Sequence, residues 1–256
     1  MKKLLQILNI LFFAITLYVN YASSVGLFNN TTQADISARY DTLFTPAGYG
    51  FSIWGLIYLL LFGFVVYQSR SLFVSVTDDT FIEKTGGWFV LSCMANSLWC
   101  YFFVCDYILL STLVIFFILF CLLQIVQKNN IKRYKAPTTT IVFLWWPFII
   151  YSGWLTVACI ANVTILLTKI GWDGWGISPQ WWTLILIGVA TFINLIVTWR
   201  QHMREFALVG AWGLVAIGIA NTERYQSIKQ MAFVCAGLLI VSSCLHLMKN
   251  KRVLFK

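Results

Sequence analysis

Long apolar runs, nearly free of charge over about 20 positions, recur along the whole chain, and polar residues gather between them. A helix of about 20 residues crosses the roughly 30 Å hydrocarbon core of a bilayer, and a segment in lipid must satisfy its own backbone hydrogen bonds. The pattern therefore predicts an all-α, polytopic membrane helix bundle. We expect about eight transmembrane helices, near 4–22, 49–68, 86–105, 107–127, 138–168, 181–199, 206–220 and 230–248.

The composition supports this class. Of 256 residues, 60% are hydrophobic and only 11% are charged, and the mean hydropathy is +0.80. A soluble domain carries roughly 25% charged residues, so this chain lacks the polar surface that a globule in water needs. The seventh run is short for one crossing, and the fifth is long enough to tilt or to project beyond the bilayer.

The basic residues are distributed unevenly between the connections. With a cytoplasmic N-terminus, 14 of the 18 Lys and Arg residues fall on the cytoplasmic side. The positive-inside rule then predicts that both termini are cytoplasmic, and we expect a bacterial inner membrane. The net charge of +9 thus reflects topology, and no nucleic-acid partner is expected. A cleaved signal peptide over the first run is the alternative to a first span. The 14 bases are Lys2, Lys3, Arg70, Lys84, Lys128, Lys132, Arg133, Lys135, Arg200, Arg204, Lys249, Lys251, Arg252 and Lys256.

Prolines mark several helix starts. Thr45-Pro46 and Ser178-Pro179 have the pattern of an N-cap followed by a first-turn proline, and Pro137 precedes the fifth run. Pro147 lies inside the fifth run, where it removes a backbone donor and should kink the helix.

Ionisable residues are absent from the middle of every apolar run. Ion-coupled pumps and proton relays place such groups at membrane depth, so these classes are not expected. No nucleotide-binding, hydrolase or metalloprotease motif occurs, and an enzymatic role is left open but not favoured. The seven cysteines lie in or at the ends of runs, where we interpret them as packing residues, and no metal site is expected.

Aromatic residues are in excess, with 12 Trp, 11 Tyr and 21 Phe. Some of them share a helix face with polar or small residues, because positions three or four apart are neighbours on a helix. A buried Trp offers a broad apolar face and an N–H that wants a partner. A binding site for a flat ligand and ordinary helix packing are both compatible with such stripes. The candidate ligand-binding residues are Trp54, Tyr58, Asn96, Trp99, Tyr151, Trp154, Ala158 and Asn162.

These residues carry a resemblance to a known family. Three segments resemble motifs of the tryptophan-rich sensory proteins, the TspO/MBR or translocator protein (peripheral benzodiazepine receptor) group. They are Phe44-Thr-Pro-Ala-Gly-Tyr-Gly-Phe-Ser-Ile-Trp-Gly-Leu-Ile-Tyr58, Asn96-Ser-Leu-Trp99 and Tyr151-Ser-Gly-Trp154…Ala158…Asn162. The resemblance implies a five-helix bundle over residues 1–168. Residues 169–256 then form a three-helix carboxy-terminal extension, as in a long form of the family.

The resemblance also implies a function. Members of that family bind porphyrins, and some bind sterols, so the eight residues would form a pocket for haem, protoporphyrin or another apolar small molecule in a receptor or carrier. No cofactor is required, although haem or porphyrin would be the bound group. The family's sterol pattern is absent after Asn162, because no Tyr follows before Lys169.

Two alternatives remain open. One is an enzyme that degrades porphyrin with light or oxidant, in which a Trp supplies an electron. The other is a membrane assembly or scaffold protein, in which the added helices dock another protein or a second copy in a homodimer. Glycines in the extension would permit the close helix approach that such docking needs. They are Gly188, Gly210, Gly213 and Gly218.

Overall fold

The computed structural model describes residues 1–76, 78–132 and 135–249, and over these ranges it contains helices and no strands. Four of the basic residues used to predict topology, Arg133, Lys251, Arg252 and Lys256, lie outside the described residues.

Each of the eight predicted runs is a helix, so the all-α class is confirmed. They are α1 (Lys2–Ser24), α3 (Ile53–Ser69), α5 (Trp88–Val104), α6 (Ile108–Lys128), α8 (Trp146–Lys169), α9 (Pro179–Arg200), α10 (Arg204–Ala220) and α11 (Gln226–Lys249). The apolar runs did not predict the short elements between them. These are α2 (Gln33–Arg39), α4 (Phe81–Thr85), α7 (Thr138–Thr140) and the turns η1 (Gly48–Ser52), η2 (Arg70–Leu72), η3 (Ile141–Trp145) and η4 (Gly174–Gly176).

The helices have the length and composition of membrane spans. Among the described residues, six helical segments are long and apolar enough to cross a bilayer, and α5 is a shorter apolar helix. Helix α10, the predicted seventh span, has 17 residues. The protein is therefore a polytopic helical membrane bundle.

The chain folds into two compact units. Unit 1 comprises Met1–Arg39 with Gly55–Tyr151, and unit 2 comprises Tyr40–Trp54 with Ser152–Lys256. Residues 152–168 thus pack with the carboxy-terminal helices, although the sequence grouped them with the first five spans. The domain boundary at residue 168 stays a prediction.

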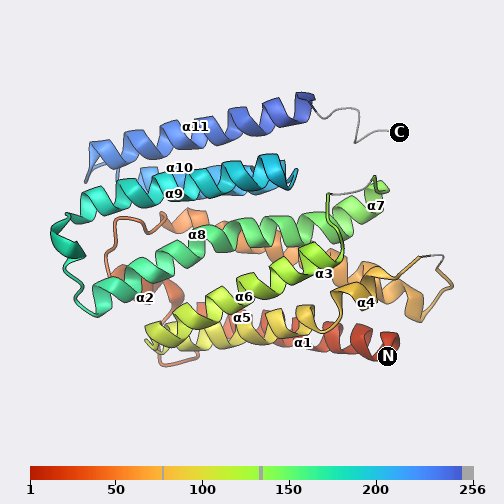
Figure 1. The fold of residues 1–256 in the computed structure, drawn as a ribbon. Coiled ribbons are helices and arrows are strands. Elements are labelled where there is room, and N and C mark those ends of the chain that lie inside the picture. Colours follow the sequence, from red (N-terminus) through yellow and green to blue (C-terminus); the bar gives the residue numbers. More distant parts are fainter. Residues whose placement is uncertain (77, 133–134, 250–256) are drawn as a thin grey trace. The chain divides into compact units, whose positions relative to one another are not determined.

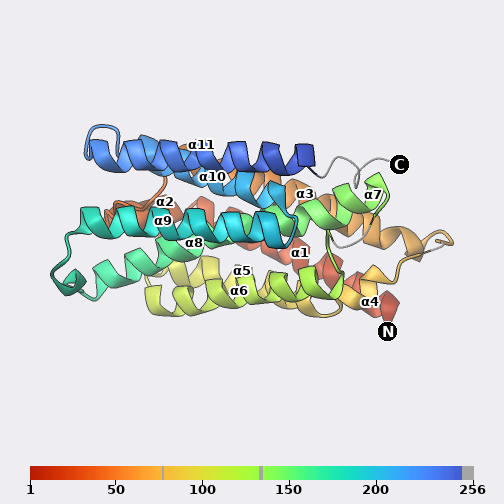
Figure 2. The same ribbon diagram turned by 45° about the horizontal axis from the view of Figure 1, so that its top comes forward.

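In unit 1, α5 packs against α1 on one side and α6 on the other (Figures 1 and 2). Aromatic rings fill the interior between α3, α5 and the start of α8. The Phe64 ring lies edge-on to Phe89 at 5.0 Å and to Phe148 at 4.9 Å between centroids, and all three side chains are fully buried. Such edge-to-face pairs add about 0.5–1.5 kcal/mol each to the burial of their surface.

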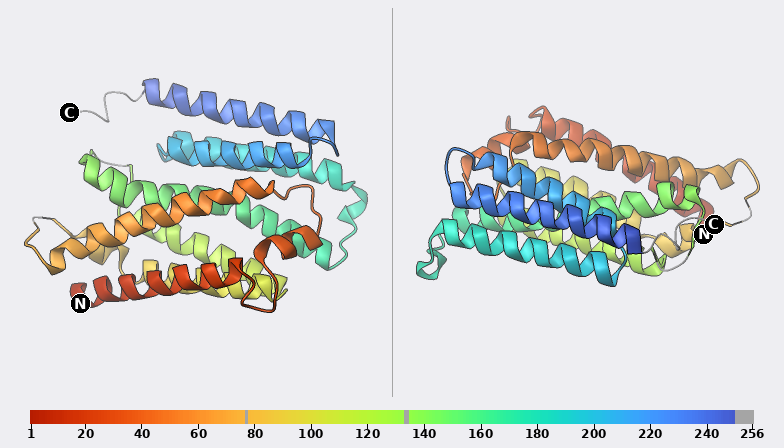
Figure 3. Two further views of the ribbon diagram at one scale, coloured as in Figure 1. Left: turned by 180° about the vertical axis from the view of Figure 1, so that it is seen from behind. Right: turned by 90° about the horizontal axis from the view of Figure 1, so that it is seen from above.

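In unit 2, helices α9, α10 and α11 run side by side (Figures 1 and 3). Small residues allow this approach, because a Cβ at Gly210 would collide with the side-chain amide of Asn194. Gly213 and Gly218 similarly face Val157 and Ala232, whereas a Cβ at Gly188 would meet nothing described within 4 Å. Three of the four glycines that suggested docking to a partner are therefore used in packing within unit 2.

The proline predictions had different outcomes. The Ser178 hydroxyl accepts from Trp181 N at 3.4 Å, with Pro179 in the first turn of α9, as predicted. The prediction for Thr45-Pro46 was wrong, because the helical turn begins only at Gly48 and the Thr45 hydroxyl pairs with Thr42 at 2.6 Å. The Ala47 amide, which follows Pro46, donates to the Ala216 carbonyl of α10 at 3.1 Å. Pro147 is the second residue of α8, and the π-helical turn η3 ends at Trp145, two positions before it. Irregular turns of this kind occur where a proline removes a backbone donor from a helix.

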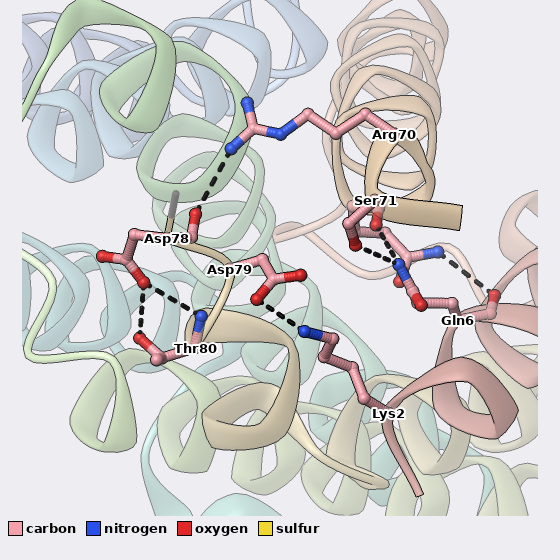
Figure 4. Close-up of polar contacts among 8 residues, drawn as sticks. Lys2, Gln6, Arg70, Ser71, Asp78, Asp79 and Thr80 are labelled. Carbon is pink, nitrogen blue, oxygen red and sulfur yellow. Dashed lines mark hydrogen bonds and ion pairs between the residues drawn. The ribbon is translucent and has the colours of Figure 1, made fainter. Parts of the chain in front are cut away.

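Basic residues and their partners gather at one end of unit 1 (Figure 4). Lys2 Nζ lies 2.7 Å from Asp79 Oδ1, and Gln6 Nε2 donates to Ser71 Oγ at 2.8 Å. The start of α1 and the connection after α3 therefore share this end. Asn129, at the end of α6, donates to Thr85 Oγ1 at 3.1 Å, which brings the third basic connection to the same place.

Candidate functional site

The eight predicted site residues divide equally between the two compact units. Tyr58, Asn96, Trp99 and Tyr151 belong to unit 1, and Trp54, Trp154, Ala158 and Asn162 belong to unit 2.

In unit 1, the side-chain amide of Asn96 is the centre of a buried hydrogen-bond network. Asn96 is 1% exposed, and its Nδ2 donates to Tyr151 Oη at 2.7 Å. The Tyr58 hydroxyl donates to Asn96 Oδ1 over a longer 3.5 Å. The sequence assigned these three residues to three different motifs, and the structure brings their polar atoms together from α3, α5 and α8.

Three further residues join the network, and sequence reasoning missed them. Asn20 Nδ2 of α1 donates to Asn96 Oδ1 at 2.7 Å, and Cys100 Sγ donates to Asn20 Oδ1 at 3.2 Å. Gln33 Nε2 of α2 then donates to Cys100 Sγ at 3.4 Å. The available signal was an isolated Asn inside an apolar run, since a polar group at that depth needs a partner.

Trp99 lies one helical turn beyond Asn96 and is buried. Its ring stacks on Phe103 of the same helix, with centroids 5.4 Å apart and planes 27° apart. This stacking holds the Trp99 indole in one orientation. Along α5, the indole follows Asn96, the centre of the polar network, by three positions.

In unit 2, Trp154 is the most enclosed of the predicted residues. Its side chain is 1% exposed, and the Phe51 ring stands edge-on to it at 6.0 Å and 83°. Among the described residues, no acceptor lies within hydrogen-bond reach of the Trp154 indole Nε1. Ala158 and Asn162 follow one and two turns later on α8, and Asn162 is buried. Trp54, half-buried, is the second residue of α3.

The chemistry available to these residues is hydrogen bonding and ring contact. All eight side chains are neutral in their ordinary state, so they provide no fixed charge. Within the described ranges, no group of three or more His, Cys, Asp or Glu residues is arranged to hold a metal. Within each unit, such side chains suit an uncharged ligand with an apolar surface and a few polar atoms.

The model of the family described as TSPO-like protein matches residues 6–245. The match continues beyond the five predicted helices, through α9 and α10 and most of α11. No curated protein and no solved structure matches the chain.

Proposed function

The chain belongs to the TSPO-like protein family, and from that premise we propose that it is an integral membrane receptor or carrier for a planar, apolar small molecule. The family alone suggests a membrane receptor or carrier of apolar ligands. We propose more narrowly that the ligand is a tetrapyrrole such as haem or protoporphyrin, which the protein binds without altering it.

The observation that carries the proposal is the buried indole of Trp154. A buried polar group nearly always has a hydrogen-bond partner, and leaving one unmade costs about 1–3 kcal/mol. Trp154 Nε1 has none among the described residues. A ligand that brings an acceptor atom to this donor and lays its ring against the nearby aromatic side chains would remove that cost.

The network around Asn96 in unit 1 is, by itself, also suited to a ligand with polar edge groups. Interlocking hydrogen bonds with Asn20 and Tyr151 hold the amide of Asn96 in place at 2.7 Å each. A site that is rigid before binding loses less entropy when its ligand arrives. A porphyrin has polar edge groups, and fixed amides and hydroxyls such as those of Asn96 and Tyr151 are side chains that could bind them.

We further propose that the protein lies in a bacterial inner membrane with both termini in the cytoplasm. The support is electrostatic. Lys2, Arg70, Lys84 and Lys128 all belong to connections at one end of unit 1, as the hydrogen bonds from Lys2 and Asn129 indicate. Lys and Arg beside spans are retained on the cytoplasmic side.

The proposal is tested by titrating purified protein with protoporphyrin and following tryptophan fluorescence. We expect saturable quenching, and a roughly 2- to 10-fold weaker affinity in Trp154→Phe, which keeps an aromatic ring but loses the N–H donor. Trp199→Phe is the matched control, because its indole already donates to Ser242 Oγ at 2.9 Å and it is not among the site residues. Equal affinities in both variants would count against Trp154 as a ligand-binding residue. Extraction of the ligand afterwards should return intact protoporphyrin, whereas a degraded pigment would indicate an enzyme.

A further inference from the structure

The segment Tyr40–Trp54, which precedes and begins α3, packs with the carboxy-terminal part of the chain in unit 2. This segment contains Phe51, whose ring contacts Trp154, and it ends at the predicted ligand residue Trp54. We infer that α10 and the turn after it position this segment, and that Trp212 is the central positioning residue. The inference rests on the proposed function for its link to ligand affinity.

The contacts between the segment and the turn after α10 begin at the amino-terminal end of the segment, near Tyr40. Arg224 donates from Nη1 and Nη2 to the two carboxylate oxygens of Asp41, at 2.7 and 2.9 Å. The buried amide of Asn221 donates to the Leu43 carbonyl at 2.9 Å. Both partners lie in the turn that follows α10, so the charged pair and the amide fix the first residues of the segment to one place.

Backbone contacts continue along α10 toward the site. Ala47 N donates to the Ala216 carbonyl at 3.1 Å. Gly50 lies so close to α10 that an added Cβ would stand 2.8 Å from Ala216 Cβ. Real Cβ atoms do not approach so closely, so a side chain at position 50 would push the segment away from the helix.

Trp212 completes the series next to the site. Its indole Nε1 donates to the Gly50 carbonyl at 3.0 Å, and the Tyr49 ring stands edge-on to its own ring at 5.4 Å and 87°. Residue 51 follows directly, with its ring against Trp154. Trp212 therefore acts on the proposed ligand residues through the backbone of Gly50 and the ring of Phe51.

Leu43 and Phe44 also bury their side chains in the core that Ile217, Ile228 and residues of α8 and α9 form. The extension beyond residue 168 thus has a specific task. It supplies the surface on which the segment before α3 folds, through one ion pair, three hydrogen bonds to or from the backbone and an apolar core.

The test measures amide hydrogen exchange over residues 40–52 in the unliganded full-length protein, together with protoporphyrin affinity. Trp212→Phe should raise exchange in this segment roughly 2- to 10-fold and weaken binding by a similar factor, because the Gly50 carbonyl loses its donor. The affinity is read from the absorbance of the porphyrin, so that loss of a fluorophore does not disturb it. Trp199→Phe, which loses an equivalent indole hydrogen bond elsewhere in unit 2, should change neither quantity.

The outcomes separate the two proposals. If wild-type protein binds no porphyrin while Trp212→Phe raises exchange, the proposed function fails and the positioning role stands. If wild-type protein binds and Trp212→Phe changes neither exchange nor affinity, the positioning role is overturned. Faster exchange with unchanged affinity would overturn the link to the ligand. If Trp212→Phe does not fold, the exposed Arg224→Gln serves instead, with Arg200→Gln as its control, and the same readings apply.

Discussion

The amide nitrogen of Asn96 donates to the phenol oxygen of Tyr151 at 2.7 Å, across 55 positions of sequence and in a fully buried setting. Replacing Tyr151 by Phe removes the acceptor and leaves the amide donor buried without it. We expect Tyr151→Phe to lower the free energy of unfolding by about 1–3 kcal/mol, the usual cost of an unsatisfied buried group. Denaturation in detergent micelles measures this.

The control is Tyr18→Phe, the same change at an exposed tyrosine of α1. It should stay within about 0.5 kcal/mol of wild type, as surface substitutions usually do. Equal effects of the two substitutions would show that the Asn96–Tyr151 hydrogen bond has no special energetic role.

Two glycines should respond in opposite ways to the same substitution. Gly210→Ala places a methyl group where Asn194 Oδ1 stands, and the Asn194 amide is buried and donates to the Ala190 carbonyl at 2.8 Å. We expect a loss of about 1–3 kcal/mol, as for other overpacked sites. Gly188→Ala, on the open face of α9, should be neutral or gain up to about 1 kcal/mol from helix propensity. Thermal unfolding of both variants checks the contrast, and destabilisation by Gly188→Ala would instead indicate a covered surface.

The helices could be predicted from the sequence because each apolar run satisfies the hydrogen bonds of its own backbone, whatever lies beside it. The sequence was also sufficient for Ser178-Pro179, since a cap is a local contact. The same reasoning from neighbouring residues gave a wrong helix start at Thr45-Pro46. There the Gly50 carbonyl and the Ala47 amide find partners on α10, and no local pattern records residues more than 160 positions away.

The site was only partly predictable for the same reason. Asn96 and Tyr151 could be chosen because each stands three positions before a Trp, on the same helix face, in a motif of the resembled family. Asn20 was equally visible as an isolated polar residue, but its partner became evident only when α1 was seen beside α5. Trp212 was not among the predicted site residues, and its role became evident only from the hydrogen bond that its indole N–H donates to the Gly50 carbonyl.

The pair of Lys2 and Asp79 should make stability depend on pH. The hydrogen bond from Lys2, and after it the one from Ser71, lowers the pKa of Asp79 below its ordinary value of 3.8. A carboxyl group with a lower pKa in the folded state stabilises fully above the unfolded pKa and loses this contribution as pH falls through the folded pKa. The loss therefore occurs below about pH 4.

The Lys2–Asp79 pair should contribute little to the free energy of unfolding, under about 1 kcal/mol, because it is partly exposed. We expect Lys2→Gln to lower stability at pH 7, and the difference from wild type to disappear in acid. The neighbouring Lys3→Gln should show no such pH-dependent difference. A difference between wild type and Lys2→Gln that persists unchanged at pH 2 would contradict the assignment to this ion pair.

The proposed topology can be read from two single cysteines in a background without the native seven. Leu27 lies in the connection after α1 and Val74 in the connection after α3, and both side chains are exposed. Leu27→Cys should react with an impermeant thiol reagent applied to intact cells, and Val74→Cys only after permeabilisation. The reverse pattern would invert the bundle and place both termini outside.

The most direct test of the account is a protoporphyrin titration of the wild-type protein in lipid nanodiscs, beside empty nanodiscs of the same lipid. Porphyrins partition into lipid, so the empty discs define the background. The account predicts a component of the porphyrin absorbance change that is present only with protein and saturates at about one ligand per chain. This component should weaken in Trp154→Phe and persist in Trp199→Phe. A titration that follows the empty discs at every concentration would contradict the claim that this protein binds a tetrapyrrole.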